Sequence, residues 1–119
     1  MPARESTLQV SRDGEFIHAK LLARSIMESG NLKEIREDLL VLIEASDRPM
    51  LLISFELVEE LSSSGLSMLI TINKFIEQKG GQLRLTTFHP HVYELFTITN
   101  LDKVFRIYQD VADAKASLA

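Results

Sequence analysis

The sequence contains no cysteine, which excludes disulfides, thiol catalysis and metal sites built on thiolates. It also lacks an excess of positive charge, because 13 basic residues stand against 17 acidic ones and give a formal net charge of −4. A basic surface that attracts nucleic acid is therefore not indicated. No apolar run is long enough to cross a bilayer, and residues 1–6 lack the apolar run of a signal peptide. We expect a soluble cytoplasmic protein without nucleic-acid or membrane partners.

The chain is long enough, and apolar enough, for one compact domain. It has 119 residues, of which 45% are hydrophobic, so a packed core is expected and disorder is not. Neither a linker nor an internal repeat interrupts it. We expect a single domain over residues 7–117, with residues 1–6 as a loose N-terminal end.

The first half of the sequence predicts a hairpin, a helix and a buried strand. Apolar residues alternate around Leu8 and again over residues 16–21, and the Asp-Gly turn between them favours a hairpin. Asn31 is typical of a helix N-cap, with Glu34 completing a capping-box pattern before a periodic apolar face. Residues 25–30 are expected to include a loop. Residues 50–55 are continuously apolar, which is typical of a strand covered on both faces.

The second half continues the alternation of helices and strands. A helix is expected at about residues 64–79, ended by a glycine pair, and a strand follows at 83–86. Pro90 begins a third helix, residues 104–108 form a last strand, and Asp110 caps a final helix. We expect four phenylalanines of this half to be core residues: Phe75, Phe88, Phe96 and Phe105. This order predicts an α/β fold with a largely parallel sheet.

The most informative segment is the serine run of residues 61–66, which lies between the apolar strand and the second helix. It places three hydroxyls at a helix start, where free backbone N–H groups favour negative charge. A phosphate on one of these serines would be tolerated there and would change the local surface charge. The segment indicates a switch rather than a catalyst, although serines at a helix start are also common caps.

Taken in order, several segments resemble the STAS domain, the module shared by sulfate transporters and bacterial anti-sigma factor antagonists. Residues 50–55 and 58–66 are similar to the family's buried strand and its Asp-Ser-Ser-Gly-Leu signature. Residues 79–85, 89–96 and 99–101 resemble its glycine turn and strand, its Pro-x-Val-x-x-Leu-Phe helix and the turn after that helix. The resemblance implies a single STAS-like domain with a mixed, mostly parallel β-sheet, an N-terminal hairpin and about four α-helices.

The resemblance also implies a protein-binding switch. Family members of the antagonist type bind an anti-sigma factor serine kinase, are released when that kinase phosphorylates them, and are reset by a phosphatase. On this chain the phosphoacceptor position is Ser63. The implied partner-binding residues around it are Glu28, Ser62, Ser63, Ser64, Gly65 and Leu66.

This sequence departs from the family pattern at two of those positions. Ser62 stands where the family has an acidic residue before the phosphoserine, and Glu28 stands where the family usually has the shorter Asp. The loss of the carboxylate beside Ser63 leaves open a second hypothesis, a STAS interaction module in a larger bacterial signalling assembly that is not phosphorylated. The acidic residues Glu56, Glu59 and Glu60 are expected to form a solvated edge, although they lie close enough to Ser63 to influence partner selection.

The charge around Ser63 can also be judged from the sequence. The next basic residue toward the C-terminus is Lys74, more than two helical turns away. We therefore expect no basic cluster near Ser63 to compensate a phosphate.

Enzymatic and metal-binding alternatives have little support in the sequence. Residues 65–68 begin like a nucleophile elbow but lack its closing glycine, and Ser67 would lie inside a helix. His89 and His91 lie close together, but no third ligand accompanies them. Glycines 80 and 81 are better explained as a helix stop than as a phosphate loop. We therefore expect neither an enzyme nor a bound metal or cofactor.

Overall fold

A computed structural model of the chain describes residues 7–14, 16–26, 30–86 and 89–118. Its main sheet has five strands in the order β1-β2-β4-β6-β7. The strands are β1 (Leu8–Asp13), β2 (Phe16–Leu21), β4 (Met50–Ser54), β6 (Gln82–Thr86) and β7 (Ile107–Tyr108). β1 pairs with β2 as an antiparallel hairpin, and the remaining pairs are parallel. The predicted mixed, mostly parallel sheet with an N-terminal hairpin is confirmed.

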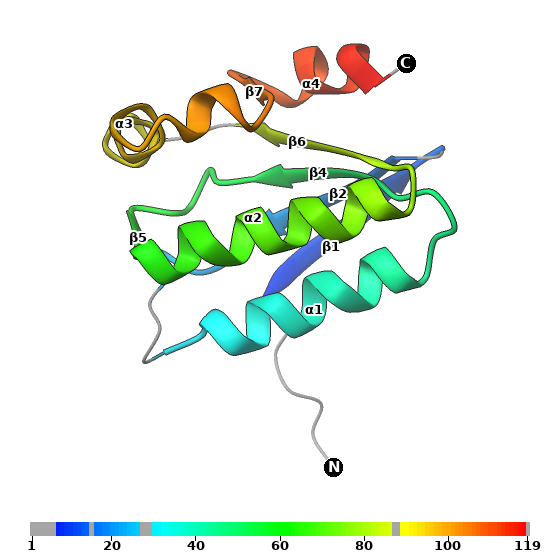
Figure 1. The fold of residues 1–119 in the computed structure, drawn as a ribbon, viewed down its shortest axis with the longest axis horizontal. Coiled ribbons are helices and arrows are strands. Elements are labelled where there is room, and N and C mark those ends of the chain that lie inside the picture. Colours follow the sequence, from blue (N-terminus) through cyan, green and yellow to red (C-terminus); the bar gives the residue numbers. More distant parts are fainter. Residues whose placement is uncertain (1–6, 15, 27–29, 87–88, 119) are drawn as a thin grey trace.

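The helices surround this sheet on both faces and at one end. They are α1 (Leu32–Glu44), α2 (Ser63–Gln78), α3 (Pro90–Ile98) and α4 (Val111–Leu118), with a short 3-10 helix, η1 (Leu101–Lys103), after α3. Figure 1 shows α1 and α2 running side by side across the sheet, while α3 and α4 lie apart from them. The four predicted helices are therefore all present.

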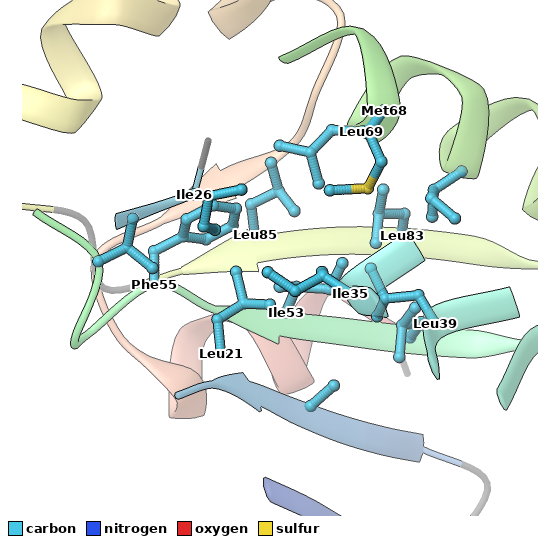
Figure 2. Packing of buried hydrophobic residues seen from close by; sticks show 14 of the residues in the cluster. Leu21, Ile26, Ile35, Leu39, Ile53, Phe55, Met68, Leu69, Leu83 and Leu85 are labelled. Atoms are coloured by element: carbon cyan, nitrogen blue, oxygen red, sulfur yellow. The ribbon is translucent and has the colours of Figure 1, made fainter. Parts of the chain in front are cut away.

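The apolar core lies between the sheet and the pair α1 and α2. Alternate residues of the central strands, such as Leu51, Ile53 and Leu85, point toward those helices and are fully buried. Figure 2 shows Ile53 and Leu85 on the side of the sheet where Ile35 of α1 and Leu69 of α2 lie. Burying a side chain of this size contributes roughly 1.5–3 kcal/mol. This layer fixes how α1 and α2 sit relative to each other.

The opposite face of the sheet is more polar and is covered by α4, which packs against β4 and β6. Arg84 and Thr86 of β6 are buried there, as is Ser54 of β4. The Arg84 guanidinium donates hydrogen bonds to the Ser117 hydroxyl (2.8 Å) and to the Gln82 side-chain oxygen (2.6 Å). These contacts fix the last turn of α4 to the sheet.

A second, two-stranded sheet lies beside the start of α2. It pairs β3 (Ser25–Ile26) with β5 (Glu60–Leu61) in parallel. The stretch of residues 25–30, which was expected to include a loop, thus begins with a strand, and residues 27–29 lie outside the described residues. Two-residue strands carry no periodic signal, so only the pairing itself reveals them.

Aromatic packing attaches α3 to one end of the main sheet. The Phe96 ring meets Phe55 edge-on at 6.3 Å between centroids and Phe105 at 5.9 Å. Phe96 and Phe105 are core residues as expected, whereas Phe75 is 42% exposed, so its expected place in the core is wrong. Phe88 lies outside the described residues.

Candidate functional site

The start of α2 is positioned by the small β3–β5 sheet. After β5 the chain turns at Ser62, whose N–H donates to the Ile26 carbonyl at 3.0 Å. The Ser62 hydroxyl then accepts a hydrogen bond from the Gly65 N–H at 3.1 Å, and the Ser62 carbonyl accepts from the Leu66 N–H. Ser62 is thus the N-cap of α2, and its hydroxyl satisfies one of the amides left free at the helix start.

Of residues 63–66, which directly follow the cap, Ser63 is the one that is exposed. Ser64 is half-buried, and Leu66 belongs to the apolar core. Gly65 is buried so closely that an added Cβ would lie 2.5 Å from Leu61 Cδ1. A larger residue at position 65 would therefore require the Leu61 side chain to move, whereas Ser63 is reachable from outside.

A groove of about 430 Å³ runs between α1 and α2 beside Ser63. The residues that line it are Leu32, Lys33, Arg36, Ser63, Ser64, Ser67, Met68 and Thr71. Lys33 and Arg36 thus come to Ser63 from a helix that lies some thirty residues earlier in the chain. The expectation that no basic cluster lies near Ser63 is wrong, because it considered neighbours along the chain and not across the two helices.

An acidic segment, residues 56–60, lies just before Ser63 in the chain. Glu56, Glu59 and Glu60 are all exposed between the end of β4 and the start of α2. Two of them take part in surface ion pairs: Lys20 Nζ lies 3.2 Å from a Glu56 oxygen, and Arg24 Nε lies 3.7 Å from a Glu59 oxygen. Ion pairs this exposed contribute little to stability, so these carboxylates remain available to a partner.

The remaining sequence predictions for the site have mixed outcomes. Glu28 lies outside the described residues, so its place near Ser63 stays a prediction. Asn31 stands at the N-cap position of α1, but its side chain makes no cap hydrogen bond. Its side-chain amide instead donates to the Ser25 carbonyl at 3.0 Å, which attaches the start of α1 to β3. The predicted N-cap position is therefore confirmed, but the capping hydrogen bond expected from the Asn31 side chain is absent.

Lys33 and Arg36 are the residues that the sequence reasoning missed. Both are exposed on α1, three positions apart, a spacing that places them on one helix face. That spacing was readable from the sequence. The contact of this face with the start of α2 was not, because it depends on how the two helices pack.

Neither a metal cluster nor a membrane-spanning helix is found within residues 7–14, 16–26, 30–86 and 89–118. No three potential metal ligands come together there, and His89 and His91 are exposed at the start of α3. None of the described helices combines the length and apolar character that a bilayer crossing requires.

Comparisons with known proteins agree with this geometry. A family model described as the STAS domain matches residues 23–114. An anti-sigma F factor antagonist of Paenibacillus polymyxa is 29% identical over 68 residues, which are 57% of this chain and 58% of that protein. The chain thus matches little more than half the length of that curated relative.

Solved structures share the fold at low sequence identity. A STAS-domain anti-sigma factor antagonist from Planctomyces limnophilus superposes with a TM-score of 0.82 at 21% identity, covering 94% of this chain and 97% of the other. The Bacillus cell fate determinant SpoIIAA, in its phosphorylated form, superposes with a TM-score of 0.69 at 16% identity, covering 94% and 99%.

Proposed function

Because the chain belongs to the STAS domain family, we propose that it is an anti-sigma factor antagonist, a binding module without enzymatic activity of its own. In this proposal it binds an anti-sigma factor serine kinase through the surface around Ser63, the kinase phosphorylates Ser63, and the modified protein is released. A phosphatase resets it. The observation that carries the proposal is the exposed Ser63 hydroxyl at the start of α2.

The similarity to anti-sigma factor antagonists supports this assignment at the level of the protein class. One of the structural relatives is itself described as phosphorylated, which makes a regulatory phosphate compatible with the fold. The role of Ser63 in this chain comes from its position in the signature and from its exposure.

Phosphorylation of Ser63 would change the surface without unfolding the domain. The phosphate adds a charge of roughly −1.5 to −2 at a helix start that has no acidic residue in its first turn. Free amides at that end favour the negative charge. A partner surface that packs closely against the small Ser63 side chain would lose those contacts, at about 1–3 kcal/mol for each buried polar group left without a partner.

A second candidate function is that of a STAS interaction module that is never phosphorylated. It is favoured by Ser62, because a neutral hydroxyl engaged in capping Gly65 replaces the carboxylate of the family signature. In this alternative the same surface around Ser63 binds a partner in a signalling assembly, and no kinase modifies it.

Incubation with a purified anti-sigma factor kinase and ATP distinguishes the two functions. We expect the intact mass to rise by one phosphoryl group, and Ser63→Ala to abolish the gain. Ser67→Ala is the matched control, since it removes another exposed hydroxyl of α2, one turn further on, and should leave the gain intact. Stable binding to the kinase without any mass gain would support the unphosphorylated module instead.

A binding measurement tests the release step. We expect the phosphorylated protein to bind the kinase at least tenfold more weakly than the unmodified protein, which corresponds to a loss of about 1.4 kcal/mol or more. Equal affinity of the two forms would contradict the switch, whether or not Ser63 is modified.

A further inference from the structure

The groove between α1 and α2 is positively charged, with no negative charge among its lining residues. Lys33 and Arg36 line it from α1, and the facing side of α2 contributes hydroxyls and Met68. Ser63 and the two cations therefore line the same groove.

Both cations are available to bind an anion. Lys33 and Arg36 are exposed, and within the part of the chain that the structure describes neither forms an ion pair. Each has a long, flexible side chain, and a guanidinium can bind a phosphate through two parallel hydrogen bonds. An unmodified serine hydroxyl offers these groups little, whereas a phosphate offers three acceptor oxygens.

We propose that Lys33 and Arg36 bind the phosphate on Ser63 within the same molecule, so that the modified protein has α1 and α2 joined across the groove. This proposal rests on the proposed phosphorylation of Ser63. It adds a second change to the surface, because the phosphate also neutralises two cations that the unmodified protein displays.

As a consequence, the surface of this protein loses complementarity to its partner in two ways. Around Ser63 the phosphate introduces negative charge, and along the groove Lys33 and Arg36 are no longer free to contact an acidic segment of a partner. A phosphate held against α1 is also less accessible to a phosphatase than one on a free side chain.

The test is a ³¹P NMR titration of the full chain with phosphoserine installed at position 63 during synthesis. The second pKa of a free phosphoserine is about 6, and opposite charges within contact distance lower such a value by about one pH unit or more. We expect this lowering in the otherwise unchanged protein. We expect K33Q/R36Q to raise the pKa back by about one pH unit.

Two further variants separate specific contacts from net charge. K74Q/K103Q removes the same number of positive charges from exposed residues that do not line the groove, and it should leave the lowered pKa unchanged. K33R/R36K keeps both charges and should also preserve it. Circular dichroism of each variant checks that the fold is intact.

A phosphate that titrates near 6 in the unchanged chain overturns the proposal. So does a lowered pKa that persists in K33Q/R36Q, because it would then come from the backbone amides of α2. Since the phosphoserine is installed without a kinase, failure of any kinase to modify Ser63 contradicts the proposed function and leaves this titration interpretable.

Discussion

Two neighbouring hydroxyls at the start of α2 have different tasks. Ser62 is half-buried and accepts a hydrogen bond from the Gly65 N–H, so its side chain belongs to the helix cap. Ser63 is exposed and lies next to the cations of α1. The stability of the helix start depends on the first hydroxyl, and the proposed switch uses the second.

Substitutions at position 62 test this division. Ser62→Ala removes the cap acceptor and should lower the free energy of unfolding by about 1 kcal/mol in urea denaturation. Ser62→Asp should retain most of the stability, because a carboxylate caps equally well. Ser63→Ala is the control, and a surface change of this kind should stay within about 0.5 kcal/mol of the original protein. Equal losses at both positions would contradict the assignment of the cap.

For single residues, the sequence predicts features that depend on neighbours along the chain and misses those that depend on tertiary packing. The place of Ser63 at a helix start follows from the apolar strand before it and the periodic helix after it, and its exposure is confirmed. Asn31 shows the limit, because its side chain binds the Ser25 carbonyl instead of the amides of its own helix. The proximity of Lys33 to Ser63 likewise depends on tertiary packing.

Among the elements, the connection from α2 to β6 brings the backbone close to Pro49, the residue before β4. Gly80 has a φ of 72°, a left-handed conformation that ends α2. At Gly81 an added Cβ would lie 2.0 Å from the Pro49 carbonyl oxygen, while the Gln82 N–H donates to that same oxygen at 2.9 Å. The second glycine therefore allows β6 to pair beside β4.

We expect Gly81→Ala to destabilise the protein more than Gly80→Ala. The first substitution places a methyl group against the Pro49 carbonyl oxygen and disrupts the β4–β6 pairing beside it. We expect the free energy of unfolding to fall by about 3 kcal/mol, which is among the larger effects of single changes. The second meets no atom within 4 Å and costs roughly 1–2 kcal/mol for a side chain at positive φ. Thermal unfolding of the two variants gives the order, and the reverse order would contradict the close approach at Pro49.

The sequence predicted long elements better than short ones. Residues 50–55 and the helix at about 64–79 carry strong hydrophobic patterns, and both are present with boundaries within a residue or so. The expected strand at 104–108 is confirmed only at Ile107–Tyr108, because Val104 follows a 3-10 helix and Phe105 turns into the core. The β3–β5 sheet could not be predicted, since each of its strands has two residues and depends on the other.

The whole molecule has two unlike layers. Between the main sheet and the helices α1 and α2 the packing is apolar, as Figure 2 shows. On the other face, beneath α4 and along β2, polar and charged side chains are partly or fully enclosed. Proton binding can therefore affect stability through the second layer, whereas the buried cluster of the first consists of hydrophobic side chains, which do not titrate.

His18 on β2 is the histidine of the second layer, and it is half-buried. Its Nε2 atom is buried and has no hydrogen-bond partner among the described residues. Burial lowers the pKa of His18 below its usual value of about 6.5, and the positive charges of Lys115 on α4 and Lys20 on β2 lower it further. Glu56, in the turn after β4, opposes this in part.

Because the pKa of His18 is lowered in the folded protein, the unfolded chain binds the proton more readily. Stability from this group is therefore fully present above about pH 7 and is lost as the pH falls below about 6.5 toward the lowered folded value. We expect the urea midpoint to decrease between pH 8 and pH 5.5. His18→Gln should reduce this dependence, whereas changing His89 and His91 to Gln should preserve it, since both are exposed. An unchanged pH dependence in His18→Gln would show that carboxylates, and not the enclosed imidazole, couple this layer to protons.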